Sequence, residues 1–267
     1  MSKRAAEKFL ELAEVIARLR GENGCPWDKQ QTHETLREFL LEECYEVLEA
    51  LDERNPQKLG QELGDLLLQI MLHAQIASEN GEFKLEDVID NIKSKIIRRH
   101  PHVFGNVRVM NADEVSHNWE SIKREERKPG AFLLDSVPAN MPALAYSQEV
   151  QRRAAQVGFD WEDVEGVIEK LAEEIREFQR STTMSGKEDE FGDIVFTLVN
   201  IARKSGIDAE TALRQANRKF YRRFKAMENL CRKRNLSLNT LSFAEQNALW
   251  EEAKKIVDSS NQGDEHT

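Results

Sequence analysis

Five short motifs occur twice in this chain and keep the same order in both halves. In the most informative pair, Leu41-Glu-Glu-Cys-Tyr-Glu46 corresponds to Ala172-Glu-Glu-Ile-Arg-Glu177, and each is followed by a Glu-x-Gly-Asp string beginning at Glu62 or Glu190. The other three pairs are Gly24–Trp27 with Gly158–Trp161, Lys95–Arg99 with Lys219–Arg223, and Trp119–Lys123 with Trp250–Lys254. Because a repeat of this kind marks one structural unit used twice, we expect two related domains.

Apolar residues recur at helical spacing through most of the chain. The N-terminal segment is typical, with Phe9, Leu12, Ala13, Ile16 and Leu19 on one face, whereas alternating strand-type runs are scarce. An all-α fold follows. Glycine and proline gather in residues 129–142, so we predict an N-terminal helical domain at 1–128, a linker at 129–142 and a C-terminal helical domain at 143–267.

The overall composition excludes several classes of partner. The formal net charge is −10 and the pI is near 5.3, so a phosphate backbone or an anionic membrane surface would be repelled over most of the protein. No apolar stretch is long enough to span a bilayer. Three cysteines without metal-ligand or disulfide spacing fit a reducing compartment. We therefore expect a cytoplasmic protein without nucleic-acid or membrane partners.

Acidic residues lie in pairs on two successive helices of the first unit. Glu43 and Glu46 fall together on the flank of one apolar helix face. On the following helix, from Glu62 to Ala74, leucine, isoleucine and methionine occupy most of the circumference, which predicts burial on nearly all sides. The polar stripe of this helix consists of Glu62, Asp65, Gln69 and His73.

The second unit repeats the arrangement with Glu174, Glu177, Glu190 and Asp193. Four carboxylates on two packed helices repel one another, and burying them without compensation is costly. A cation resolves the repulsion, and an all-carboxylate ligand set suits Mg²⁺, or Mn²⁺, better than zinc. The sequence therefore predicts a metal site in each unit.

Basic residues follow the acids at a fixed place in each unit. They offer charge-assisted hydrogen bonds to phosphate, and a tryptophan with a lysine one turn later adds a flat ring and a further cation. Solvated helix ends and core tryptophans are the alternative interpretation. The residues are Lys95, Arg98, Arg99, Trp119 and Lys123 in the first unit, and Lys219, Arg222, Arg223, Trp250 and Lys254 in the second.

At these motifs the chain closely resembles the MazG family of all-α nucleoside triphosphate pyrophosphohydrolases. The likeness extends over nearly the whole chain and includes the strings Gly24–His33 and Arg98–Phe104. It implies hydrolysis of a nucleoside triphosphate to the monophosphate and diphosphate, with Mg²⁺ held by the four acids of a unit. It also places the substrate contacts in the C-terminal unit, at Lys187, Lys219, Arg222, Arg223, Trp250 and Lys254.

The expected chemistry is attack of a metal-activated water at the α-phosphorus, with Lys219, Arg222 and Arg223 stabilising the leaving diphosphate. The sequence leaves open which of Glu174, Glu177 and Glu190 is the general base, and which base and sugar are preferred. The rival interpretation is a non-catalytic helical protein that binds metal or nucleotide for regulation. A di-iron bundle is disfavoured because the acids lack histidine three residues on.

Two expectations concern organisation. Each unit has few helices, so we expect the apolar faces to be buried by bundling with a second copy in a homodimer. We further expect the C-terminal unit to carry most of the turnover, because its Arg222 and Arg223 are flanked by aromatic residues. In the first unit, Arg98 and Arg99 run directly into His100-Pro101, which ends the helix.

Overall fold

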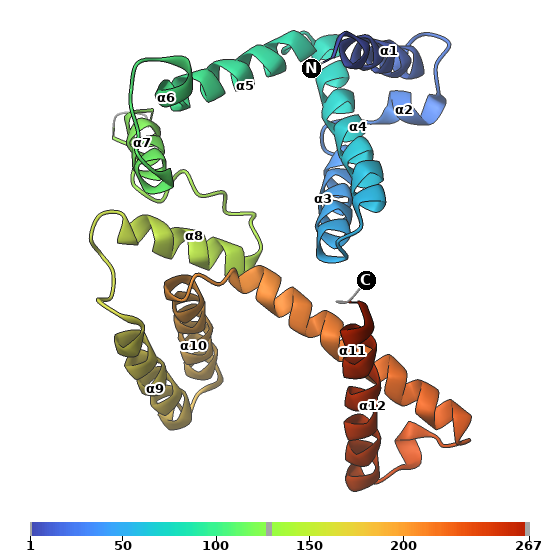
Figure 1. Ribbon diagram of the computed structural model, residues 1–267, viewed down its shortest axis with the longest axis vertical. Coiled ribbons are helices and arrows are strands. Elements are labelled where there is room, and N and C mark those ends of the chain that lie inside the picture. The colour runs from blue at the N-terminus through green and yellow to red at the C-terminus, as the bar shows by residue number, and fades with distance from the viewer. Residues whose placement is uncertain (1, 127–129, 265–267) are drawn as a thin grey trace. The chain divides into compact units, whose positions relative to one another are not determined.

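The computed structural model describes residues 2–126 and 130–264, and all regular structure in these residues is helical (Figure 1). The all-α prediction is confirmed. The chain divides into two compact units, Met1–Arg127 and Lys128–Thr267. The predicted boundary between residues 128 and 129 lies outside the described residues. No described helix combines the length and the apolar character needed to cross a bilayer.

The first unit is built around a hairpin of two antiparallel helices, α3 (Leu36–Asp52) and α4 (Pro56–Asn80). Asn55 begins the second of them by accepting hydrogen bonds from the backbone amides of Gln57 and Lys58, and Pro56 occupies its first turn. Gly81 ends the same helix at a φ of 73°, a left-handed conformation that favours glycine. The helices are α1 Lys3–Arg20, α2 Pro26–Gln30, α3 Leu36–Asp52, α4 Pro56–Asn80, α5 Leu85–Arg99, α6 Pro101–Phe104 and α7 Ala112–Glu125.

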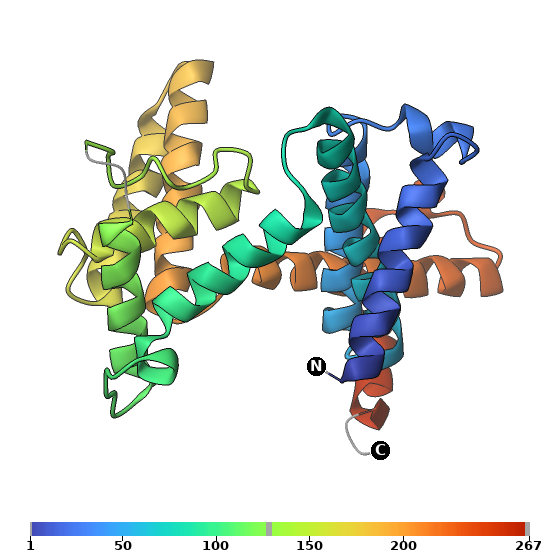
Figure 2. The same cartoon turned by 90° about the horizontal axis from the view of Figure 1, so that it is seen from above.

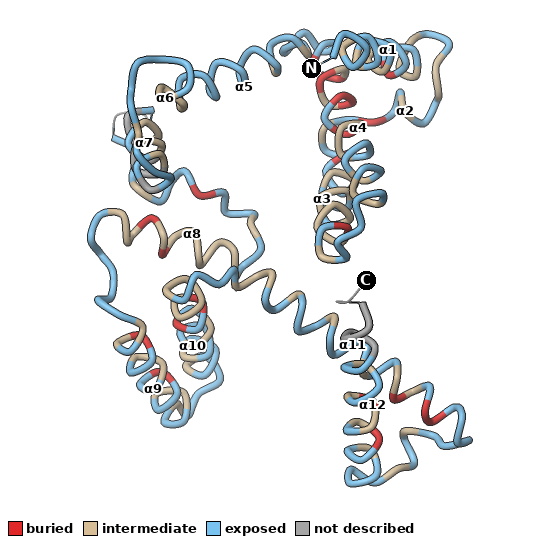
Figure 3. The backbone as a smooth tube through the Cα atoms, in the orientation of Figure 1, coloured by how far each residue is buried: buried red, intermediate tan, exposed pale blue. Residues whose placement is uncertain are grey.

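The core of this unit lies where α1 packs against the start of α3 and the second half of α4. Its buried side chains are Ile16, Leu36, Met71, Leu72 and Ile76, and buried residues gather along this part of α4 (Figure 3). Each such side chain contributes roughly 1.5–3 kcal/mol by leaving water. The core therefore lies at one end of the α3–α4 hairpin, and the other end, which carries the acidic residues, projects away from it.

The second unit contains two helical pairs, α9 with α10 and α11 with α12. Asp163, Thr183 and Asp208 begin α9, α10 and α11 by accepting a hydrogen bond from a backbone amide three residues on. Both views show α9 and α10 side by side (Figures 1 and 2). The helices are α8 Ala143–Ala155, α9 Val164–Arg180, α10 Met184–Lys204, α11 Ala209–Lys233 and α12 Phe243–Asp264, with a short 3₁₀ turn, η1, at Leu238–Thr240.

The predicted linker is held against α8 in its described part. Val137 is buried, and Nη1 of Arg153 donates a 2.9 Å hydrogen bond to Oγ of Ser136. A second cluster, Met227, Leu230, Cys231, Leu249 and Ala253, joins α11 to α12. The three cysteines are free thiols.

The helix from Glu62 to Ala74 is less buried than the sequence suggested. Leu63 and Ile70 on α4 remain 49% and 44% exposed, and Phe191 and Leu198 on α10 remain 58% and 47% exposed. The prediction of burial on nearly all sides is wrong for the single chain. The physical reason is that each acid-bearing helix packs against its hairpin partner on one side, while an apolar strip on another side stays exposed among the described residues of its own unit.

Candidate active site

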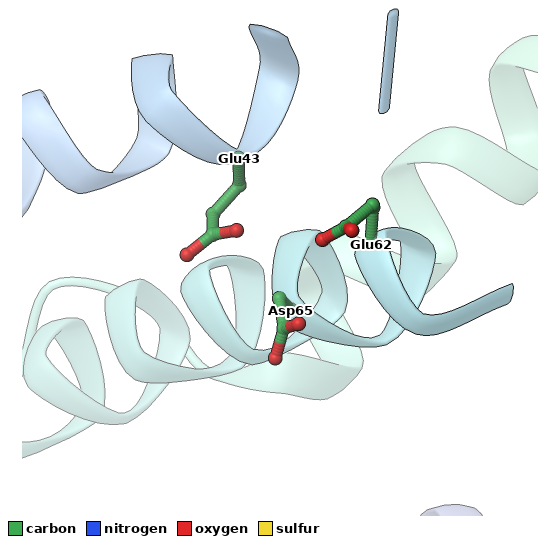
Figure 4. Close-up of side chains that lie close together, drawn as sticks. All are labelled: Glu43, Glu62 and Asp65. Atoms are coloured by element: carbon green, nitrogen blue, oxygen red, sulfur yellow. The ribbon is translucent and has the colours of Figure 1, made fainter. Parts of the chain in front are cut away.

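The α3–α4 hairpin brings together three of the four predicted acids of the first unit. Carboxylate oxygens of Glu43, Glu62 and Asp65 all lie within 4.8 Å of one another. Figure 4 shows Glu43 reaching from α3 toward the part of α4 that carries Glu62 and Asp65. The antiparallel pairing of two helices with acids at i and i+3 produces this convergence. Glu46 lies outside the group of three, yet its charge acts on Glu62.

These carboxylates disturb each other's ionisation. The pKa of Glu43 is raised by partial burial and then by the negative charges of Asp65, Glu46, Glu42 and Glu62. The pKa of Glu62 is raised by partial burial, followed by the charge of Glu46 and a hydrogen bond with it. Without a cation the cluster therefore resists full ionisation, as expected for like charges held close together.

The second unit reproduces the cluster on α9 and α10. Here Glu174, Glu177 and Glu190 have carboxylate oxygens within 4.8 Å of one another. Asp193 is exposed and lies outside this group, but it contributes to the Glu190 pKa, which is raised by partial burial and then by Glu177, Glu174, Asp193 and Asp189. Glu174 is 5% exposed, so one of the three carboxylates is withdrawn from solvent.

Lys170 is a member of the second cluster that the sequence motifs did not reveal. Its Nζ lies 2.8 Å from a carboxylate oxygen of Glu174 and 2.6 Å from one of Glu173. Hydrogen bonds to Glu173 and Glu174 raise the pKa of Lys170. The i, i+4 spacing of Lys170 and Glu174 was a usable signal, but such pairs are common on solvated helices. In the first unit Phe39 stands at the corresponding place, four residues before Glu43.

The donor chemistry fits a hard divalent cation in both units. Each cluster offers three carboxylate oxygens from two helices, without a sulfur or imidazole ligand in the group. In the second unit the fit includes the nearly buried carboxylate of Glu174, for which charge compensation is most needed. Glu43, Glu62 and Asp65, and separately Glu174, Glu177 and Glu190, are therefore the residues that could hold a metal, with Glu46 and Asp193 beside them.

Two of the basic residues of the first unit are bound to an acid of the same unit. Arg98 and Arg99 both pair with Glu126, at 2.6 and 2.5 Å, and Arg99 also lies over the Trp119 ring at 5.3 Å. The Arg99 hydrogen bond comes first among the causes that lower the Glu126 pKa to about 2, and burial opposes the shift. Lys95 is exposed on α5.

In the second unit, the predicted substrate contacts gather on α11 and α12. Phe220 packs on Trp250 with ring centroids 5.2 Å apart, and Arg223 pairs with Asp258 at 2.9 Å. Lys254 pairs with Glu251 at 2.5 Å. Lys219 and Arg222 are exposed on α11, and Lys187 is exposed near the start of α10.

Within one chain Lys187 lies on α10 with the acids, whereas the other predicted substrate contacts lie on the separate α11–α12 pair. Helix α12 packs on α11, whereas α9 packs on α10, and extensive packing between α12 and the α9–α10 hairpin is absent from the described part of the unit. The structure thus assembles the acids into a cluster and does not bring Trp250 or Lys254 to it. The assignment of Lys187, Lys219, Arg222, Arg223, Trp250 and Lys254 as substrate contacts stays a prediction.

Comparison with known proteins gives one consistent answer. The sequence model of the MazG nucleotide pyrophosphohydrolase domain matches residues 31–104, which contain the first acidic cluster. The chain is 45% identical to the nucleoside triphosphate pyrophosphohydrolase/pyrophosphatase MazG of Thermotoga maritima, over 94% of this chain and 98% of that protein. It is 42% identical to the nucleoside triphosphate pyrophosphohydrolase of Escherichia coli K12, over 91% and 96%.

Two further matches are partial. The uncharacterized protein YabN of Bacillus subtilis is 46% identical over 93% of this chain and 52% of its own length. A crystal structure of a mazG-related protein from Thermotoga maritima is 33% identical and covers 43% of this chain and 97% of that one, with a TM-score of 0.38. On the strength of its near full-length similarity to the two pyrophosphohydrolases, this chain belongs to the MazG nucleotide pyrophosphohydrolase family.

Proposed function

We propose that this protein hydrolyses nucleoside triphosphates to the monophosphate and diphosphate in a metal-dependent reaction. The observation that carries the proposal is the convergence of Glu174, Glu177 and Glu190 on one helical hairpin, repeated by Glu43, Glu62 and Asp65 on another. The names of the relatives from Thermotoga maritima and Escherichia coli point to the same activity. Mg²⁺ is the proposed cation, with Mn²⁺ as a substitute, because the donors are carboxylates.

In this reaction, water attacks the α-phosphorus, and the bond from that phosphorus to the bridging oxygen breaks as diphosphate leaves. When bound, the divalent cation would neutralise triphosphate charge and lower the pKa of the attacking water. One of Glu174, Glu177 and Glu190 accepts the proton of that water, since a general base needs a carboxylate within hydrogen-bond reach. The raised pKa of Glu190 suits it to hold this proton.

The basic residues would then act on the leaving group. Lys219, Arg222 and Arg223 on α11 can form charge-assisted hydrogen bonds with phosphate oxygens, and arginine can bind them with two parallel bonds. Nε of Arg223 is buried without a hydrogen-bond partner in the described residues, so this guanidinium retains donor capacity beyond its pair with Asp258.

We also propose that the protein works as a homodimer. The exposed apolar residues Leu63 and Ile70 lie seven positions apart on α4, and therefore on one face. Phe191 and Leu198 show the same spacing on α10. A second copy that covers these faces would bury them, and it could supply the basic residues that one chain holds apart from its acids.

A cytoplasmic location fits the three free cysteines.

The proposed reaction is tested by incubating the protein with a panel of canonical, deoxy and modified nucleoside triphosphates in the presence of Mg²⁺. Monophosphate and diphosphate in equal amounts are expected, with no turnover after exhaustive chelation. If the products are instead a nucleoside diphosphate and orthophosphate, the cleaved bond is the one between the β- and γ-phosphates. Saturable nucleotide binding without any hydrolysis would favour the non-catalytic regulatory alternative.

A further inference from the structure

We propose that the second unit binds the nucleobase of its substrate in a cavity between α8, residues 158–162 and α10. The inference rests on the proposed function and deepens it, because it assigns the base to a place separate from the acidic cluster. The cavity has a volume of about 630 Å³, within the usual range of small-molecule sites. Phe159, Trp161 and Phe196 form aromatic walls, and Gln151, Asn200 and Arg203 are among the polar residues.

Gln151 is the strongest single indication of a ligand. The residue is 7% exposed and lines the cavity. Its Nε2 donates a 2.8 Å hydrogen bond to the carbonyl oxygen of Phe196, which fixes the orientation of the amide, because a carbonyl accepts only from the nitrogen end. Its Oε1 is buried without a partner among the described residues. A buried acceptor left in this state costs free energy, so the cavity calls for a ligand with an N–H donor.

The aromatic residues suit a planar ligand. Phe159 is 82% exposed and Trp161 is 43% exposed, although both line the cavity. The Trp161 ring lies against Gly166 in the first turns of α9, where a Cβ on the glycine would come within 3.0 Å of the ring. The close approach holds the indole in place. Stacking of a base on such a ring is favourable and tolerates any base, because every base has a π-face.

Three other polar residues of the cavity, Asp160, Asn200 and Arg203, bond with one another, and Glu162 adds an exposed carboxylate to the lining. Nη1 of Arg203 donates to Asp160 at 3.1 Å, Nη2 donates to the second oxygen of Asp160, and Nε donates to Oδ1 of Asn200 at 3.1 Å. Burial opposes ionisation of Asp160, but hydrogen bonds from Arg203 and Lys204 lower its pKa. The carboxylate and guanidinium therefore neutralise each other, and the cavity suits an uncharged heterocycle better than a phosphate.

The cavity lies within reach of the acidic cluster. Asn200 follows Asp193 by seven residues on α10, so it lies two turns away on the same face, at about 10 Å. Trp161 also lines a neighbouring hollow of about 550 Å³ together with Lys170, whose Nζ contacts Glu174. A nucleotide with its base in the cavity and its phosphates directed toward Glu174 and Glu190 spans this distance through the ribose.

Free nucleosides test the proposal without involving phosphate, metal or hydrolysis. The chain has four tryptophans, whose indole N–H signals can be followed by NMR in ¹⁵N-labelled full-length protein and assigned by single Trp→Phe variants. Titration with adenosine, guanosine, cytidine and thymidine should shift the signal missing from Trp161→Phe saturably with at least one of them. The signal missing from Trp27→Phe, the counterpart in the first unit, should stay in place. Failure of all four nucleosides to move the Trp161 signal overturns the proposal.

The role of Gln151 is tested with Gln151→Met, which keeps the side-chain length and removes the acceptor. For the nucleoside that binds, wild type should prefer the parent over an analogue lacking the donor, such as purine riboside for adenosine or 2-pyrimidinone riboside for cytidine, by about tenfold. The variant should lose this preference while keeping a cooperative melting transition. If it retains the preference, Oε1 does not read the base and the assignment falls.

Two controls separate this inference from others. If the protein hydrolyses triphosphates but binds no nucleoside, the proposed function stands and the cavity assignment is wrong. If it binds a nucleoside but hydrolyses no triphosphate, the cavity assignment stands and the proposed function is wrong. Phe159→Asp should leave the molar mass in solution equal to that of wild type. A lower mass would show that the cavity mouth is an interface between copies, and would overturn its assignment to the base.

Discussion

Lys170 Nζ lies 2.8 Å from the carboxylate of Glu174, a residue that is 5% exposed and belongs to the second acidic cluster. The cluster thus has a cation of its own before any metal binds. The first unit has Phe39 at the same place, and there Lys58 acts on Glu62 through its charge while it pairs with Glu49 and Glu53. The two repeats therefore solve the same electrostatic problem differently.

Replacing Lys170 with methionine should destabilise the metal-free protein. The substitution leaves the nearly buried Glu174 carboxylate without its partner, which costs about 1–3 kcal/mol. In Mn²⁺ the loss should be smaller, because the bound ion supplies the missing positive charge. Thermal unfolding with EDTA and with Mn²⁺ measures both quantities. A matched change, Lys8→Met, removes an exposed i, i+3 partner of Glu11 and should have almost no effect in either condition. An equal loss with and without Mn²⁺ would contradict the idea that Lys170 stands in for the metal.

Divalent cations should raise the melting temperature of the wild-type protein. Partial burial, followed by the negative charges of neighbouring carboxylates, raises the pKa of Glu43, Glu62 and Glu190, so the metal-free clusters carry unfavourable repulsion that a bound cation removes. A ligand present at about 100 times its Kd stabilises the folded state by about 2.7 kcal/mol. Calorimetry in Mg²⁺, in Mn²⁺ and after chelation checks this, with Ca²⁺-free buffer and a monovalent salt of matched ionic strength as control. Identical curves in all conditions would rule out metal binding by either cluster.

The helical pairs and the acidic clusters could be predicted from the sequence because both depend on local periodicity. Spacing of i and i+3 places Glu62 and Asp65 on one face, and a short connection at residues 53–55 forces α3 and α4 to pair, which delivers Glu43. In α9 and α10 the i, i+3 pair that joins the cluster is Glu174 with Glu177, and of the two predicted acids of α10 only Glu190 reaches it. Family membership, predicted from longer strings, is confirmed by the comparisons.

Features that depend on contacts between residues far apart in the chain could not be predicted from the sequence. The pairing of Glu126 with Arg98 and Arg99 spans α6, α7 and the loop between them, whose course no motif specifies. The cavity beside Gln151 likewise needs α8, the 158–162 segment and α10 to meet, and glutamine carries no pattern that distinguishes it from a solvated residue. The exposure of Leu63 was mispredicted because periodicity shows that a face is apolar without showing what covers it.

Glu126→Gln should lower stability at neutral pH and matter less in acid. The folded-state pKa of Glu126 is about 2, below its ordinary value of 4.5, so its ion pairs contribute fully above pH 4.5 and are lost as the pH falls through about 2. The expected loss at pH 7 is about 1 kcal/mol, since Arg98 is largely exposed. Denaturant unfolding of both proteins between pH 7 and pH 3 should show that the difference between their free energies of unfolding becomes smaller in acid. A difference in free energy of unfolding that grows toward pH 3 would contradict the lowered pKa of Glu126.

Substitutions on the uncovered apolar face of α4 should dissociate the proposed homodimer. Leu63→Asp or Ile70→Asp places a charge where a second copy would bury an apolar side chain, and such burial is costly without a partner. Light scattering at micromolar concentration should give a dimer mass for wild type and a monomer mass for the variants. Leu10→Asp on α1, at a residue that is 63% exposed, serves as the matched control and should remain dimeric. A monomeric wild type would remove the basis of the prediction.

The two units are expected to differ in turnover, and Glu62→Gln with Glu190→Gln compares them at equivalent members of the two clusters. Each change is nearly isosteric and removes one metal-ligand charge. In the first unit, Arg98 and Arg99 are held by Glu126, whose side chain is 22% exposed, so a triphosphate must displace a well-formed pair. In the second unit, Arg223 is held by Asp258, whose side chain is 55% exposed and more easily displaced. The basic residues of the second unit should therefore be more available to substrate.

Glu190→Gln should accordingly reduce kcat by at least about 100-fold, the scale of losing a general base or a metal ligand, whereas Glu62→Gln should retain most of the activity. Both proteins should remain folded, because each change relieves like-charge repulsion, and their melting temperatures in EDTA should equal or exceed that of wild type. This stability measurement separates a catalytic defect from misfolding. If Glu62→Gln abolished turnover of every triphosphate in the panel while Glu190→Gln left it intact, the first unit would be the catalytic one, and the greater availability of Arg223 would have to be assigned to binding alone.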